Sequence, residues 1–245
     1  MDVNLIYILI GFALGGILKG ATGAGAPILV VPIIAMTYNV PLAVTIFIMP
    51  NIISNVWQGW SHRAHSLPLI FVLQFAIAGA LGAAAGTVML ASLSGETLKL
   101  MVAFAVLAYI AFRMMKPEWV LAYARAVQLV FPIGIVAGIL QGASGISAPV
   151  SITFLNAMRL ERGQFISTIS VFFVSMAIVQ LPLLMSYGFL TLERFWLSCA
   201  AIIPLVAFMP VGSFLAKKIS KQTFDRVILA LLAVVALKLI YEAWA

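Results

Sequence analysis

Hydrophobic residues run along this chain in long blocks that short polar connections separate. A helix needs about 20 apolar residues to cross a bilayer. Six blocks have that length and are each predicted to form one transmembrane helix: Leu42 to Trp60, Pro68 to Leu93, Leu98 to Met115, Phe165 to Tyr187, Phe195 to Ala216 and Phe224 to Trp244. Two further blocks, Leu5 to Tyr38 and Val127 to Met158, are too long for one helix and short for two full ones.

A repeated glycine-rich motif interrupts both long blocks near the middle. GILKGATGAGAPI (16–28) returns 122 positions later as GILQGASGISAPV (138–150), with eight of the thirteen residues identical. We therefore expect one membrane domain built from two copies of a unit, residues 1–120 and 121–245. Transporters often have such repeats, with the substrate site at the repeat interface.

Composition places the chain in a membrane. It is 64% hydrophobic and only 9% charged, whereas soluble domains are about 25% charged. The predicted fold class is an all-α polytopic membrane protein. The net charge of +7 then reports orientation in the bilayer, and no nucleic-acid partner is expected.

Basic residues favour one of two topologies. If each long block crosses once, there are eight crossings, the repeats are parallel, and the basic residues split 6 against 7. If each block folds back as a re-entrant hairpin, the split is 10 against 3, which is a strong positive-inside signal. The ten are Arg63, Arg113, Lys116, Arg125, Arg159, Arg162, Lys217, Lys218, Lys221 and Arg226, and the three are Lys99, Arg194 and Lys238. Ten full crossings would give the same sidedness and stay open.

The hairpin topology predicts two inverted repeats. Each unit would hold one glycine-broken hairpin and three full crossings, and because three is odd the second copy enters from the opposite side. Both termini would lie on the outer face. Hairpin arms of about 12 to 17 residues would reach about 18 to 25 Å, so the two tips would approach the midplane from opposite leaflets.

The motif itself suits an anion. Glycines let the backbone turn sharply, and Pro27 is suited to begin a returning helix, with Pro149 in the second copy. Unpaired amides at such a break are tolerated only inside protein or at a watery cavity, and a helix N-terminus favours negative charge. Thr22 and Ser144 would add hydroxyl donors.

Lys19 is the one full charge in this environment, because every acidic residue lies near a predicted helix end or in a loop. An ionisable residue in a membrane segment is a functional candidate, and the simplest partner for Lys19 is an anionic substrate. Gln141, the matching residue, could donate hydrogen bonds without charge. In the alternative interpretation the glycines serve close packing and Lys19 extends to the membrane surface. Packing is the expected role of Gly79, Gly82 and Gly86.

Asn51, Asn55 and Gln58 lie at i, i+4 and i+7 and so share one helix face. This stripe would line a cavity or bond another helix. Its counterpart in the second copy is weaker: Ser167, Thr168, Ser170, Ser175 and Gln180. The predicted substrate-binding residues are Lys19, Gly20, Thr22, Gly23, Gly25, Asn51, Asn55, Gln58, Gln141, Gly142, Ser144, Gly145 and Ser147.

Enzyme chemistry has no sequence support here. No Walker-type phosphate loop, His/Cys metal cluster or pair of deep carboxylates is present, so we expect no catalytic residue, metal or cofactor. The single cysteine, Cys199, is best interpreted as a small buried hydrophobe.

The chain resembles the TauE/SafE family of membrane permeases, described as sulfite or organosulfonate exporters. The resemblance rests on KGATGAGAPILVVP (19–32), PNIISNVWQ (50–58) and QGASGISAP (141–149), and it covers essentially the whole chain. It implies transport of a small sulfur-containing anion, such as sulfite, sulfoacetate or another sulfonate, across a bacterial inner membrane, with export as the direction.

Together these inferences predict a secondary transporter that works by alternating access around a midplane site. An anion channel, a permease for another small anion and a non-transporting scaffold are the alternatives. A homodimer is compatible with so small a permease. The second motif has Ile146 and Ser147 where the first has Ala24 and Gly25, so the two tips need not be equivalent.

Overall fold

Helices make up the part of the chain that the structure describes, with no strand in it. The structure is a computed structural model, and it describes residues 3–115, 120–218 and 220–244. The first half contains α1 (Val3–Thr22), α2 (Ala26–Thr37), α3 (Val40–Ser61), the short 3-10 helix η1 (Arg63–His65), α4 (Leu69–Ser92) and α5 (Gly95–Met115). The second half contains α6 (Tyr123–Ser144), α7 (Ala148–Ala157), α8 (Arg162–Ser186), α9 (Leu192–Ala200), α10 (Ile202–Lys218) and α11 (Lys221–Trp244).

Seven of the described helical stretches are long and apolar enough to cross a bilayer. The six predicted blocks all form helix, but the block from Phe195 to Ala216 is divided at Ala201 into α9 and α10. Pro204 explains the division: it lacks the amide that would bond the carbonyl of Ala200, and its ring crowds that turn. The stretch Leu192–Lys218 nevertheless counts as one candidate membrane span, as predicted.

Both long blocks break at the repeated motif and fold back. In the second block, the amide of Leu121, just before α6, donates to the carbonyl of Ala157, the last residue of α7, at 2.8 Å. In the first, a Cβ added at Gly11 of α1 would lie 3.4 Å from Ile33 of α2. Each block therefore folds back on itself, which both the hairpin topology and ten full crossings predict.

The hairpin arms differ from the predicted 12 to 17 residues. The returning arms are short, with 12 residues in α2 and 10 in α7, which span about 18 and 15 Å, well under the hydrocarbon thickness of about 30 Å. The first arms are longer, with 20 residues in α1 and 22 in α6, and α6 is one of the seven candidate membrane spans. Helix α6 begins at Tyr123, four residues before the apolar block, because residues 123–126 include no helix breaker such as glycine or proline.

Each half packs its first helix against the glycine-bearing helix of the other half. A Cβ on Gly16, Gly20 or Gly212 would collide with a backbone carbonyl across the α1–α10 contact, and Gly138, Gly142 and Gly86 are blocked in the same way across the α4–α6 contact. The residues that these Cβ atoms would meet occupy corresponding positions in the two halves: Leu205 corresponds to Gly79, Met209 to Ala83, and Ile139 to Ile17. Small residues allow helices this close approach, which confirms the packing role expected for Gly79, Gly82 and Gly86.

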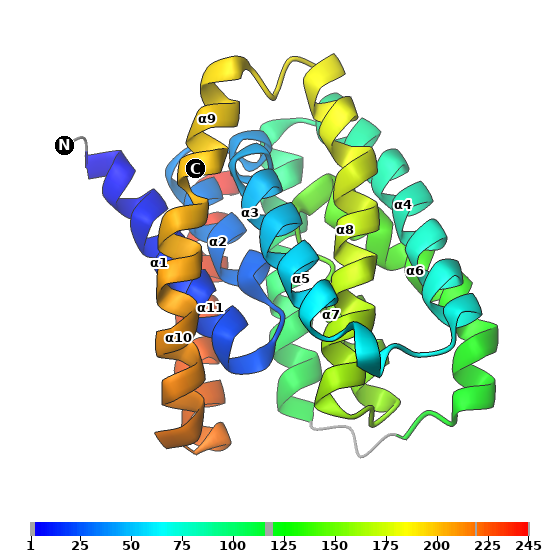
Figure 1. The fold of residues 1–245 in the computed structure, drawn as a ribbon. Coiled ribbons are helices and arrows are strands. Elements are labelled where there is room, and N and C mark those ends of the chain that lie inside the picture. The colour runs from blue at the N-terminus through cyan, green and yellow to red at the C-terminus, as the bar shows by residue number, and fades with distance from the viewer. Residues whose placement is uncertain (1–2, 116–119, 219, 245) are drawn as a thin grey trace.

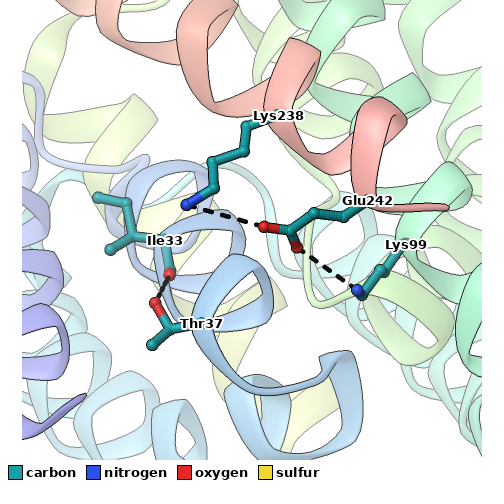
Figure 2. Close-up of polar contacts among 5 residues, drawn as sticks. All are labelled: Ile33, Thr37, Lys99, Lys238 and Glu242. Atoms are coloured by element: carbon teal, nitrogen blue, oxygen red, sulfur yellow. Dashed lines mark hydrogen bonds and ion pairs between the residues drawn. The ribbon is translucent and has the colours of Figure 1, made fainter. Parts of the chain in front are cut away.

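Connections gather at two ends of the bundle (Figure 1). The α3–α4, α5–α6, α7–α8 and α10–α11 connections lie toward the lower end of the view, and the α4–α5 and α8–α9 connections toward the upper end. The larger group of basic residues lies in the lower connections and in the adjoining helix ends, although Lys116 lies outside the described residues. At the opposite end Glu242 of α11 pairs with Lys99 of α5 at 3.4 Å and with Lys238 at 3.7 Å (Figure 2).

Candidate anion-binding site

Left-handed glycines form the first tip, between α1 and α2. Gly23 has φ 83° and Gly25, the N-cap of α2, has φ 92°, a region that favours glycine. The Thr22 hydroxyl lies 2.8 Å from the Leu18 carbonyl and also contacts that of Ala24. Thr22 is exposed, and its hydroxyl already has hydrogen-bond partners within the tip.

The second tip has a different shape. Gly145 is left-handed with φ 72°, but Ser147, where the first tip has Gly25, has φ −101°. The Ser144 hydroxyl donates to the Leu140 carbonyl at 2.7 Å, and Ser147 accepts from the Ser151 hydroxyl. The two tips are therefore not equivalent, as the unequal motifs indicated.

Each tip packs against the other half of the chain. A Cβ on Gly23 would lie 2.6 Å from Ile166 of α8, and one on Gly145 would lie 3.0 Å from Val44 of α3. Ile166 follows Val44 by 122 positions, the same offset that relates the two glycines. Movement of one half relative to the other would therefore move both tips.

Lys19 and the polar face of α3 form one hydrogen-bonded cluster. The Lys19 Nζ donates to Asn55 Oδ1 at 2.8 Å, and Asn55 Nδ2 donates to Asn51 at 2.8 Å to its carbonyl and 2.7 Å to its Oδ1. All three side chains are at most 3% exposed. Within the described residues no acidic side chain pairs with Lys19. A buried charge without a counter-charge is costly, and an anion would supply the missing one.

Two glutamines add unpartnered polar groups. Gln58, on the same side of α3 as the cluster, is 7% exposed, and Gln141 is 2% exposed. The Oε1 atoms of both lack a hydrogen-bond partner among the described residues. Buried polar atoms are nearly always paired in native proteins, so these two acceptor oxygens are suited to meet a hydrogen-bond donor such as water.

The remaining predicted residues, Gly20 and Gly142, lie at helix contacts. Gly20 packs against the backbone of Met209, and Gly142 against the backbone of Ala83. The structure thus brings Lys19, Asn51 and Asn55 together, whereas it gives these two glycines a packing role and leaves their part in binding a prediction. Sequence reasoning placed Ser170 of α8 in the weaker polar stripe but not among the binding residues, and it is fully buried with an unpartnered hydroxyl. Spacing alone cannot reveal that a hydroxyl lacks a partner.

Comparison with known proteins identifies the family. No curated protein and no solved structure matches the chain significantly. Residues 7–239 match the family described as Sulfite exporter TauE/SafE, and this match covers nearly the whole chain. The chain therefore belongs to the TauE/SafE sulfite exporter family of membrane transporters.

Proposed function

We propose that this chain is a secondary transporter that binds a small sulfur-containing oxyanion at Lys19 and exports it by alternating access of its two halves. The substrate class includes sulfite, sulfoacetate and other sulfonates. The observation that carries the proposal is the buried Lys19 ammonium, which has an amide partner, Asn55, and no acidic partner among the described residues.

The chemistry of binding follows from that cluster. Asn55 uses its oxygen on Lys19 and its amide on Asn51, so it holds the ammonium in place. An ammonium has three N–H donors, and two remain for the anion. A sulfonate or sulfite entering this interior exchanges its hydration shell for charge-assisted hydrogen bonds, which are stronger than neutral ones.

Alternating access needs two halves that can exchange roles. The first helix of each half packs through glycines against a helix of the other half, α1 against α10 and α6 against α4. This reciprocal packing supports a two-fold relation between the halves. In Figure 1, α3 descends while its counterpart α8 rises, which supports an inverted arrangement. We propose that residues 1–120 and 121–245 are these halves and that the substrate binds between them near the bilayer midplane.

Orientation follows from charge. The end of the bundle with the larger group of basic residues would face the cytoplasm of a bacterial inner membrane, by the positive-inside rule. The first turn of α1 and the last turn of α11 lie in the upper half of Figure 1, away from the lower connections, so both termini would be periplasmic.

Flux into proteoliposomes tests the function. Purified protein should give saturable uptake and counter-exchange of at least one of sulfite, sulfoacetate and taurine, and Lys19→Ala should lose it. Flux that rises linearly without exchange would indicate a channel. Uptake of a non-sulfur oxyanion alone would indicate a different permease, and no flux of any anion would indicate a scaffold.

A further inference from the structure

One turn each of α1, α3 and α8 meet beside the first tip. Lys19 of α1 bonds Asn55 of α3 at 2.8 Å. One turn further along α3, a Cβ on Gly59 would lie 3.5 Å from the Cβ of Ser170 on α8. One turn back along α8, Ile166 packs against Gly23, one turn beyond Lys19. Each of the three segments therefore contacts the other two, and we call this region the α1–α3–α8 junction.

Ser170 brings an unused hydrogen-bond donor to this junction. Ile166 and Ser170 are four residues apart, so they share one face of α8, and that face meets both Gly23 and Gly59. The Ser170 side chain is 0% exposed, and its hydroxyl has no partner among the described residues. Most buried hydroxyls in helices bond a nearby carbonyl, as Ser175 of α8 does with Ala76 and Phe172.

The corresponding junction in the other half carries no charged residue. At the offset of 122, Gln141 replaces Lys19, Ala177 replaces Asn55, and Phe173 replaces Asn51, while Ile48 of α3 matches Ser170. Ala177, Phe173 and Ile48 are at most 2% exposed. The duplicated architecture therefore carries a charged residue at one junction only.

We propose that Ser170 is a direct ligand of the anion that Lys19 binds, and that each chain has one such site, at the α1–α3–α8 junction. The inference rests on the proposed function and adds to it a ligand from the second half. Two free Lys19 N–H groups and the Ser170 hydroxyl make three donors, which matches the three oxygens of sulfite or of a sulfonate group.

Binding of sulfite to purified protein by isothermal titration calorimetry tests this inference. We expect one sulfite per chain, and about tenfold weaker binding in Ser170→Ala, with Ser170→Thr retaining most of the affinity because it keeps a hydroxyl. Ser175→Ala is the matched control, because it makes the same change on the same helix at a hydroxyl that is already partnered. It should bind like the unmodified chain.

Stability separates a binding role from a structural one. Removing an unpartnered buried hydroxyl should leave the melting temperature of Ser170→Ala unchanged or higher, so weaker binding with a lower melting temperature would overturn the inference. Unchanged affinity in Ser170→Ala, or binding of two sulfite ions per chain, would also overturn the inference. In either case, loss of binding in Lys19→Ala would still support the proposed function. If the unmodified chain binds no sulfite, sulfoacetate or taurine, the proposed function itself fails.

Discussion

The Lys19 ammonium donates to the Asn55 carboxamide oxygen at 2.8 Å, while the Asn55 amide is held by Asn51. This chain of bonds fixes the orientation of Asn55, because its nitrogen has two acceptors on Asn51 and its oxygen must then face Lys19. The cluster is neutral apart from the ammonium. Its net charge is therefore available to an incoming anion.

Asn55→Asp should remove anion binding. The new carboxylate would lie beside the ammonium and form a buried ion pair, which cancels the charge that attracts substrate. We expect sulfite affinity to fall at least 100-fold, measured by calorimetry. Asn39→Asp is the control: Asn39 is exposed and caps α3 by accepting from the Leu42 amide, which Asp does equally well. Sulfite affinity close to that of the unmodified chain in Asn55→Asp would contradict the charge argument.

Gly212→Ala should destabilise the bundle. Its Cβ would meet the carbonyl of Ile17, which belongs to helix backbone and cannot move aside cheaply. Overpacking of this kind costs about 1–3 kcal/mol, visible as a lower melting temperature in detergent. Gly95→Ala, with nothing within 4 Å of the added Cβ, should melt close to the unmodified chain. Equal melting of both variants would argue against the close α1–α10 contact.

Gly25→Ala tests the shape of the first tip. An added Cβ has room there, since its nearest neighbour is Leu18 at 3.5 Å, but φ 92° strains an L-residue by about 1–2 kcal/mol. Gly188→Ala meets the same strain at φ 72° with open space around it. Both variants should lose similar stability, whereas only Gly25→Ala should slow transport. Equal transport by both would show that the tip conformation does not affect the site.

Cysteine accessibility tests the hairpin topology. With Cys199 replaced by Ala, single cysteines at Asn39 and at Leu160 should react with an impermeant reagent from opposite sides of the membrane, because the hairpins leave three crossings between them. The single-crossing topology places four crossings between these positions and therefore predicts labelling from the same side. Intact cells and inverted vesicles provide the two directions of access.

Sequence reasoning located the main features because they depend on local chemistry. Glycine and proline can be recognised from residue identity, so the breaks around Gly23 and Gly145 and the hairpins were predictable. The shared face of Asn51 and Asn55 followed from helical spacing. The charge count pointed to the fold-back that the bond between Leu121 and Ala157 confirms.

Features that depend on partners distant in sequence were not predictable. Gly20 and Gly142 belong to the same motif as the turn glycines, and only the positions of Met209 and Ala83 reveal their packing role. The bond between Lys19 and Asn55 joins residues 36 positions apart. Whether the Ser170 hydroxyl has a partner depends on every helix around it.

The most direct measurement of the central claim is the dissociation constant for sulfite of Lys19→Met compared with that of Lys19→Arg. Methionine keeps much of the length and apolar packing of lysine but has no charge, and arginine keeps the charge with a different shape. Loss of a buried charged partner costs about 3–5 kcal/mol. The account predicts at least 100-fold weaker binding in Lys19→Met and a smaller loss in Lys19→Arg. Binding by Lys19→Met as tight as that of the unmodified chain would contradict it.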